Sequence, residues 1–113
     1  MAETLRETDN ITTGGVKFDN GKISFALVPW VAVKAVAQVL NYGARKYAPR
    51  NWELGMDWSR PYDGALRHLS AWWEGEDKDP DTGMSHLWHA ATNLFFLIAY
   101  EARGAGNDDR VKS

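Results

Sequence analysis

The sequence predicts an all-α fold, a small helical bundle of three main helices preceded by an extended N-terminal arm. Apolar residues recur at helical spacing in three segments, and no segment shows convincing strand alternation. Clusters of Pro, Gly and polar residues separate these segments. With 113 residues, the chain is long enough for one domain with a real core, so we expect a single domain over 1–113. The polar ends, 1–15 and 104–113, are expected to be mobile.

The first predicted helix begins near Pro29, which suits a first helical turn, and runs to about Tyr47. Gly43 fits inside this helix or, alternatively, caps its end. Its apolar face is formed by Val31, Val36, Ala35, Val39, Leu40 and Tyr42. Before it, the Asn20–Gly21 turn signal permits a small hairpin over 16–25, and an extended arm over the helices is the alternative.

The second predicted helix spans about 60–75, and Ser59 before Arg60–Pro61 is expected to cap its start. Its broad apolar face comprises Leu66, Leu69, Trp72 and Trp73. An acidic turn over 76–84 leads to a third helix, which Ser85 is expected to cap and which ends near Arg103. The core stripe of this helix is predicted to be Leu87, Ala91, Leu94 and Ile98.

Composition excludes several functions. The absence of Cys excludes disulfides, thiol catalysis and Cys-based zinc sites. The formal net charge of −2, with no strongly basic stretch, argues against duplex nucleic acid as a partner. We expect no signal peptide and no membrane association, because the longest apolar run, Leu94 to Tyr100, is far too short to span a bilayer. Six Trp and a largely apolar third helix predict a homodimer or homotetramer, with the active site near a subunit interface.

All three histidines lie between positions 68 and 89, beside five acidic residues. On the third predicted helix, His86, His89 and Asn93 share one stripe, which we expect to face inward. Imidazoles and carboxylates are ligands for divalent metals, and the acidic loop suits Mg²⁺ or Mn²⁺. The metal or water-activating candidates are Glu76, Asp79, Asp81, His86 and His89, of which Glu76, His86 and His89 are the catalytic candidates.

Alternatives to this site remain. The histidines could be hydrogen-bonded core or surface residues, and the acidic loop a solvated turn. The spacing does not match an EF-hand. Zinc held by two histidines and a carboxylate is possible, although the His-x-x-x-His spacing is absent.

A second cluster, over 41–52, combines cations, amides and aromatic rings. Cations beside a metal site suit a polyphosphate, and aromatic rings suit a base. We expect Lys46, Arg50 and Asn51 to hold phosphates and Trp52 to stack on a base. Further substrate-binding candidates are His68, Asn93 and Lys22. The alternative is a basic helix end that complements the helix dipole, with Trp52 in the core.

Three segments carry a resemblance to a known family: KFDNGK (17–22), NYGARKYAPRNW (41–52) and RHLSAWWEGEDKDPDTGMSHLWHAATNLFFL (67–97). They resemble the phage-encoded dATP/dGTP diphosphohydrolases, small relatives of the MazG-like all-α nucleoside triphosphate pyrophosphohydrolases. The resemblance covers roughly residues 16–101. The wider superfamily holds metal with a Glu-Glu-x-x-Glu helix and a Glu-x-x-Asp helix. In the corresponding helices this chain instead has Arg67–His68 before Glu74–Gly75–Glu76, and His86-x-x-His89.

The resemblance implies an oligomeric MazG-like helical bundle. Its implied activity is hydrolysis of a purine deoxynucleoside triphosphate, dGTP or dATP, to dNMP and pyrophosphate with Mg²⁺ or Mn²⁺. It also implies a role in phage nucleotide metabolism, in the cytoplasm of the host cell. One alternative is a nucleotide-binding protein without turnover, such as a sponge for a signalling nucleotide. Another is a structural helical protein whose Trp residues form a partner interface.

Overall fold

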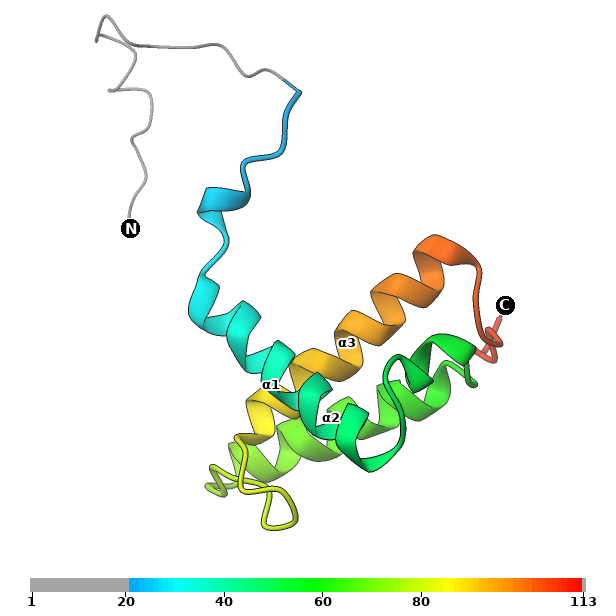
Figure 1. The fold of residues 1–113 in the computed structure, drawn as a ribbon. Coiled ribbons are helices and arrows are strands. Elements are labelled where there is room, and N and C mark those ends of the chain that lie inside the picture. Colours follow the sequence, from blue (N-terminus) through cyan, green and yellow to red (C-terminus); the bar gives the residue numbers. More distant parts are fainter. Residues whose placement is uncertain (1–20, 113) are drawn as a thin grey trace, which may run out of the picture.

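Three α-helices dominate the computed structural model, which describes residues 21–112 (Figure 1). They are α1 (Trp30–Lys46), α2 (Ser59–Trp73) and α3 (His86–Arg103), accompanied by the short 3-10 helices η2 (Phe25–Leu27) and η3 (Asn51–Leu54). Between residues 21 and 112 there is no β-strand, and the all-α prediction is confirmed. Residues 1–15, predicted to be mobile, lie outside the described residues.

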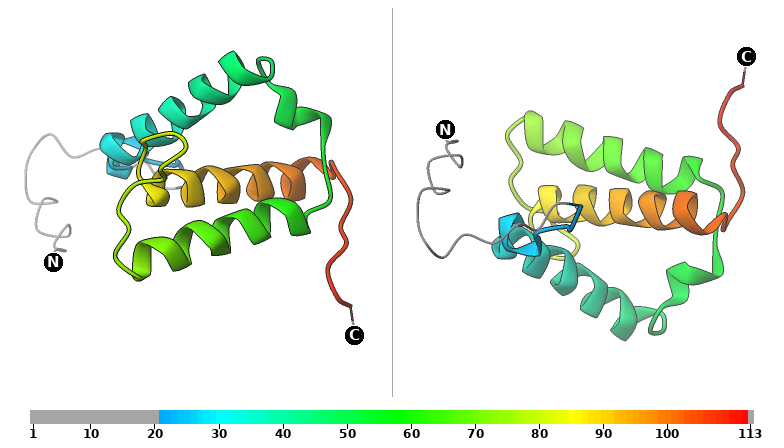
Figure 2. Two further views of the ribbon diagram at one scale, coloured as in Figure 1. Left: turned by 90° about the horizontal axis from the view of Figure 1, so that it is seen from below. Right: turned by 90° about the horizontal axis from the view of Figure 1, so that it is seen from above.

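Helix α3 is the centre of the arrangement and lies between α1 and α2 (Figure 2). Helices α2 and α3 form a hairpin, and small residues allow them to approach closely. A Cβ atom on Gly64 of α2 would lie only 3.0 Å from Nδ2 of Asn93 on α3. The buried residues of the two helices are Pro61, Gly64, Ala65, His86, Ala90, Thr92 and Tyr100. The hairpin therefore brings the histidines of both helices together.

The two predicted helix caps differ in outcome. Ser85 caps α3 as predicted, because its side-chain oxygen accepts a hydrogen bond from the backbone N–H of Leu87. The prediction for Ser59 is wrong, since Ser59 is the first residue of α2 and its side chain makes no cap. Both its N–H and its hydroxyl donate to the carboxylate of Asp109. The C-terminal segment thus supplies the acceptor at this helix start.

The residues that follow α3 run back to the start of α2. Trp58 donates its indole N–H to the carbonyl of Ala105, and Asp57 forms an isolated bridge with Asn107. Gly106 has a φ of +73° and packs directly against the backbone of Met56, so no side chain fits there. The mobility predicted for 104–113 stays a prediction, and these contacts define where residues 105–109 lie.

The predicted core stripe of α3 is wrong for the single chain. Leu87, Leu94 and Ile98 are 39%, 46% and 63% exposed. The buried side of α3 instead passes through His86, Ala90 and Tyr100, because α1 and α2 cover only that part of the helix. A matching stripe on α2 is also exposed and consists of Tyr62, Leu66, Leu69 and Trp73.

These two stripes have identical spacing, since each places apolar residues at i, i+4, i+7 and i+11 along its helix. Helix geometry, combined with the Gly64–Asn93 and His68–His86 contacts, puts both stripes on the same side of the α2–α3 hairpin. We call this surface the apolar hairpin face: Tyr62, Leu66, Leu69, Trp73, Leu87, Ala91, Leu94 and Ile98. None of the described helices is long and apolar enough to cross a membrane.

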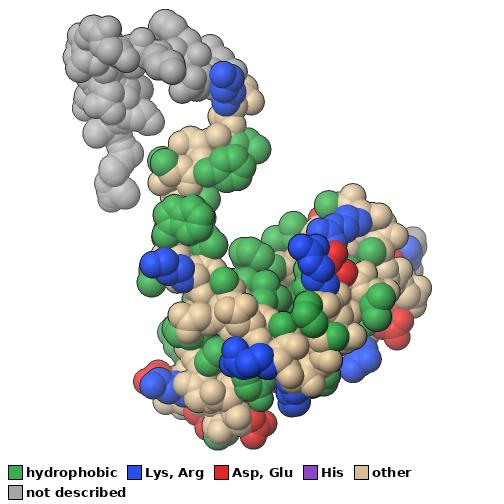
Figure 3. All heavy atoms as spheres, viewed as in Figure 1, with side chains coloured by type: hydrophobic (Ala, Val, Ile, Leu, Met, Phe, Trp, Pro, Cys, Tyr) green, Lys and Arg blue, Asp and Glu red, His purple; other side chains and the backbone are tan. Residues whose placement is uncertain are grey.

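The extended N-terminal arm is confirmed in its described part, residues 21–29. All nine residues are exposed, and the arm leads away from the helices instead of lying over them (Figure 1). Apolar side chains gather along the arm and the start of α1 (Figure 3). Among them, Phe25 and Leu27 are 72% and 84% exposed. The hairpin considered for 16–25 involves residues 16–20, which lie outside the described residues.

Candidate functional site

Three side chains converge where the α2–α3 hairpin meets the loop that joins its helices. His68 of α2, His89 of α3 and Asp79 of the loop each offer one ligand atom, and these atoms lie within 4.8 Å of one another. The His68 and His89 rings are stacked, with centroids 4.7 Å apart. All three residues are partly buried. We call this group the His68–Asp79–His89 cluster.

Backbone hydrogen bonds in the loop fix the position of Asp79. Its carbonyl accepts from the N–H groups of Thr82 and Gly83, and its N–H donates to the carbonyl of Met84. One carboxylate oxygen of Asp79 accepts from the Asp81 N–H at 2.9 Å, which closes a tight turn. The other oxygen lies 3.8 Å from Nε2 of His89. The turn therefore directs this carboxylate towards α3.

Both histidines of the cluster are suited to metal binding in neutral solution. Burial, followed by the neighbouring His89, lowers the pKa of His68, and burial lowers the pKa of His89. A lowered pKa keeps each imidazole uncharged at pH 7, the form that binds metal. Thr82 adds a hydroxyl 2.8 Å from Nε2 of His89. Two imidazoles and a carboxylate are a donor set that suits divalent transition metals and leaves coordination positions open.

The third histidine, His86, lies outside the cluster and forms hydrogen bonds with both Glu76 and His68. His86 is buried at 5% exposure, and its Nε2 lies 2.7 Å from Oε1 of Glu76. Its Nδ1 lies 2.9 Å from Nδ1 of His68. Glu76 and His86 are thus connected to the cluster through His68.

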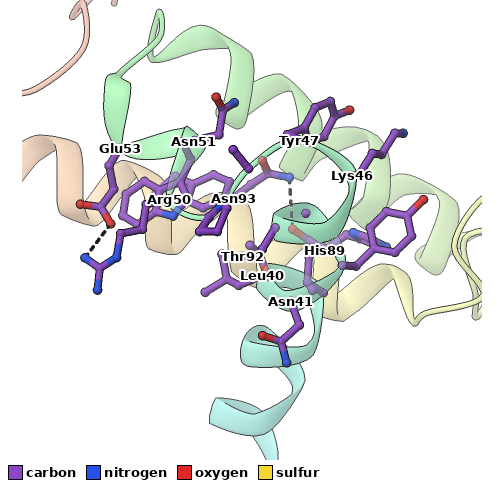
Figure 4. A pocket seen from close by; sticks show the side chains of 18 of the residues that line it. Leu40, Asn41, Lys46, Tyr47, Arg50, Asn51, Glu53, His89, Thr92 and Asn93 are labelled. Atoms are coloured by element: carbon purple, nitrogen blue, oxygen red, sulfur yellow. Dashed lines mark hydrogen bonds and ion pairs between the residues drawn. The ribbon is translucent and has the colours of Figure 1, made fainter.

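A pocket of about 710 Å³ opens between α1, η3 and α3 (Figure 4). This volume suits a small organic ligand of nucleotide size. His89, Thr92 and Asn93 line the α3 side of the pocket, while Lys46, Tyr47, Arg50 and Asn51 come from the end of α1 and the segment after it. The side chain of Asn93 donates to the carbonyl of His89 at 3.1 Å. His89 therefore belongs both to the pocket wall and to the His68–Asp79–His89 cluster.

The pocket combines cations with an apolar wall. The Tyr47 phenol beside Lys46 raises the pKa of this lysine, so Lys46 is charged in neutral solution. Arg50 pairs with Glu53 at 3.3 Å and has a left-handed φ of 61°, which is uncommon outside glycine and occurs often at functional sites. Trp52 stacks on Phe96 with ring centroids 4.8 Å apart. The guanidinium of Arg103 lies 5.5 Å from the Trp52 ring. The Trp52 indole therefore contacts both Phe96 and Arg103 of the same chain.

Most sequence-predicted site residues come together, in three groups. Asp79 and His89 belong to the cluster. The cluster also includes His68, which was predicted to bind substrate. Glu76 and His86 are connected to it through His68. Lys46, Arg50, Asn51, Trp52 and Asn93 line the pocket. Asp81 is outside the cluster, and Lys22 lies on the exposed arm, away from the pocket lining.

Thr82 was not among the predicted residues, and only its place between Asp81 and Gly83 in the acidic loop could have suggested it. Pocket residues from the middle of the helices, such as Thr92 and Leu40, were also missed. Their side chains carry no distinctive chemistry, and only the packing of α1 against α3 reveals them.

Taken together, fold and site define a small helical protein in which a nucleotide-sized pocket adjoins a candidate metal centre. Comparison with known proteins identifies the family: this chain belongs to the family described as dATP/dGTP diphosphohydrolase, N-terminal, which matches residues 12–110. The dATP/dGTP diphosphohydrolase of Salmonella phage PMBT28 is 35% identical over 96 residues, or 85% of this chain. No solved structure matches significantly.

The chain spans 33%, about a third, of the length of this curated relative. The matched residues include the segments that form both the cluster and the pocket, since these lie between positions 39 and 96. The whole local site is therefore contained in the part that the family shares.

Proposed function

We propose that this protein hydrolyses a purine deoxynucleoside triphosphate, dATP or dGTP, to the monophosphate and pyrophosphate. Membership of the family and the printed activity of the phage relative support this class of reaction. The observation that carries the proposal is the position of His89. Its side chain lines a pocket large enough for a nucleotide and also belongs to a cluster of metal-ligand type. Substrate phosphates and a divalent ion can therefore meet at one residue.

The donor set of the His68–Asp79–His89 cluster fits a divalent metal ion. His68 and His89 would each supply one nitrogen and Asp79 one carboxylate oxygen. Of the two expected ions, we propose Mn²⁺ over Mg²⁺, because imidazole ligands favour transition metals and Mg²⁺ prefers oxygen ligands. When bound, the ion would neutralise charge that develops on the phosphoryl group during transfer.

The pocket supports one orientation of the substrate. Lys46, Arg50 and Asn51 are among its polar lining residues, and Lys46 lies on the same side of the pocket as His89 (Figure 4). Lys46 would bind phosphate oxygens near His89, while Arg50 and Asn51 would bind substrate oxygens on the opposite side of the pocket. Its apolar wall contains Trp52, Phe96 and Met56, which would contact the base. Because Trp52 already stacks on Phe96, we propose that the base meets this pair as an apolar wall and is not inserted between the rings.

In the proposed reaction, water attacks phosphorus and the P–O bond that joins the α and β phosphates breaks. The water oxygen is added to one product, the bridging oxygen leaves with the other, and the two protons of the water pass to product oxygens or to solvent. Lys46 and Arg50 would stabilise the additional negative charge, which is a large part of catalysis in phosphoryl transfer. Hydrolysis of a purine dNTP would serve phage nucleotide metabolism in the host cytoplasm.

The assembly that we propose is a homo-oligomer, built on a dimer through the apolar hairpin face. Leu94, Ile98 and Trp73 are 46%, 63% and 81% exposed in the single chain, and such continuous apolar surfaces usually mark interfaces. Two copies of the α2–α3 hairpin, packed through this face, would form a four-helix bundle. The pocket lies on the other side of α3 and would stay open to substrate.

Product analysis tests the proposed activity. The purified protein is incubated with each common (d)NTP and either Mn²⁺ or Mg²⁺, and products are separated by ion-exchange chromatography. We expect dGMP or dAMP with pyrophosphate, and no reaction in EDTA. Orthophosphate with a dNDP would contradict the proposal. Tight nucleotide binding without turnover would instead support a non-catalytic binding protein.

A further inference from the structure

We propose that Glu76 and His86 are positioning residues that hold His68 in the tautomer whose Nε2 is free to bind a metal ion. This inference rests on the metal site of the proposed function, which it deepens by explaining two residues that do not line the pocket. The observation behind it is one continuous hydrogen-bonded chain from Glu76 through His86 to His68.

The two hydrogen bonds of this series each join one defined pair of side-chain atoms. Oε1 of Glu76 lies 2.7 Å from Nε2 of His86, and Nδ1 of His86 lies 2.9 Å from Nδ1 of His68. Both distances are those of good hydrogen bonds. The imidazole of His86 is almost completely buried, so water does not compete at its ring nitrogens. Nε2 is the ring nitrogen of His68 that remains for the cluster.

The proton positions follow from donor and acceptor chemistry. An ionised carboxylate only accepts hydrogen bonds, so Nε2 of His86 must carry the proton that Glu76 receives. A neutral imidazole has one N–H, which leaves Nδ1 of His86 as an acceptor. The proton in the second hydrogen bond must then come from Nδ1 of His68. Neutral His68 therefore keeps an unprotonated Nε2 with its lone pair available.

This arrangement matters because a free neutral histidine favours the opposite tautomer, with the proton on Nε2. That tautomer cannot use Nε2 as a ligand. In metal sites a hydrogen bond from the second ring nitrogen commonly fixes the tautomer and orientation of the ligand histidine. In this protein the buried imidazole of His86 connects Glu76 to His68 across the α2–α3 hairpin. Because Glu76 accepts a hydrogen bond from His86, His86 in turn accepts one from His68, and this fixes the tautomer of His68.

The first arm of the test reads the tautomers directly in the metal-free protein. The chain contains only three histidines, so long-range ¹H–¹⁵N NMR of ¹⁵N-histidine-labelled protein at pH 8 resolves each ring, and single His→Gln variants assign them. We expect His68 to be protonated at Nδ1 and His86 at Nε2. A His68 ring protonated mainly at Nε2 would overturn the inference.

The second arm changes Glu76, whose side chain is 55% exposed, so that its replacement preserves the fold. In Glu76→Ala the His68 ring should shift towards the Nε2–H tautomer, and Mn²⁺ affinity should fall about 10- to 100-fold, the usual effect of losing such a partner. Glu74→Ala is the matched control, since it removes the same charge two residues away. It should change neither the tautomer nor the affinity.

The outcomes separate this inference from the proposed function. Weaker Mn²⁺ binding in Glu76→Ala with an unchanged His68 tautomer would show a purely electrostatic role and overturn the inference. Equal losses in Glu76→Ala and Glu74→Ala would do the same. Failure of the wild-type protein to hydrolyse any dNTP would contradict the proposed function, whereas the metal-free NMR spectrum would still report the hydrogen-bonded chain.

Discussion

His89 joins the pocket to the His68–Asp79–His89 cluster, because its side chain belongs to both. We expect His89→Gln to abolish turnover, since glutamine replaces the ring nitrogen with an amide that binds metal poorly. The melting temperature of the metal-free protein should change little, because glutamine retains a polar atom for Thr82. Parallel measurements of turnover and thermal unfolding check this. A destabilised but fully active variant would show that His89 is only a structural histidine.

The lowered pKa values of His68 and His89 predict how stability depends on pH. In the unfolded chain both imidazoles have a pKa of about 6.5, so the unfolded state binds more protons below that pH. The stability contribution is complete above about pH 6.5 and is lost as pH falls through the lower folded-state values. Thermal melts of the metal-free protein should therefore show a falling melting temperature between pH 7.5 and 5. The double variant His68→Gln/His89→Gln should show a smaller decrease, and an unchanged decrease would contradict this origin.

At the residue scale, the sequence predicted the kind of site better than its exact members. Three clustered histidines beside an acidic loop indicated metal chemistry, and Asp79 and His89 were among the candidates. Which acid reaches His68 and His89 depends on the turn that backbone hydrogen bonds close around Asp79, a detail that composition does not reveal. Whether His68 meets His89 depends on the register of α2 against α3.

At the scale of the elements, the start of α3 places both the loop and the histidines, and Ser85 caps it. We expect Ser85→Ala to lower the free energy of unfolding by about 1 kcal/mol, the typical cost of losing such a cap. Urea denaturation measures this value. Ser70→Ala is the control, because Ser70 is an exposed residue of α2, and this change should be nearly neutral. Equal effects of the two substitutions would contradict the capping role.

The helices themselves were predictable because their ends carry strong local signals. The spacing of apolar residues and the positions of Pro29, Pro61 and Ser85 located all three helices to within about two residues of their bounds. Local signals failed where a distant segment takes part. The side chain of Ser59 meets Asp109, which lies 50 residues further along the chain. The stripe through Leu94 was assigned to the core because an exposed apolar stripe and a buried one have the same periodicity.

At the scale of the whole molecule, the apolar hairpin face predicts a dimer. We expect light scattering to give at least a dimer at micromolar concentration. The Leu94→Glu variant should be monomeric, because dimerisation would bury its charge without a partner at the centre of the proposed interface. Val111→Glu introduces the same charge at a residue that is 101% exposed and should leave the assembly intact. A monomeric wild-type protein would contradict the proposed assembly.

The most direct test of the central claim is whether nucleotide and metal bind to one site through His89. The affinity for a non-hydrolysable purine dNTP analogue is measured calorimetrically with Mn²⁺ and in EDTA, for the wild-type protein and His89→Gln. Coupled sites typically change each other's affinity by about 5- to 150-fold, so we expect Mn²⁺ to tighten analogue binding within that range in the wild type. The enhancement should disappear in His89→Gln. An equal enhancement in both proteins, or none in the wild type, would contradict a shared site at the His68–Asp79–His89 cluster and the pocket.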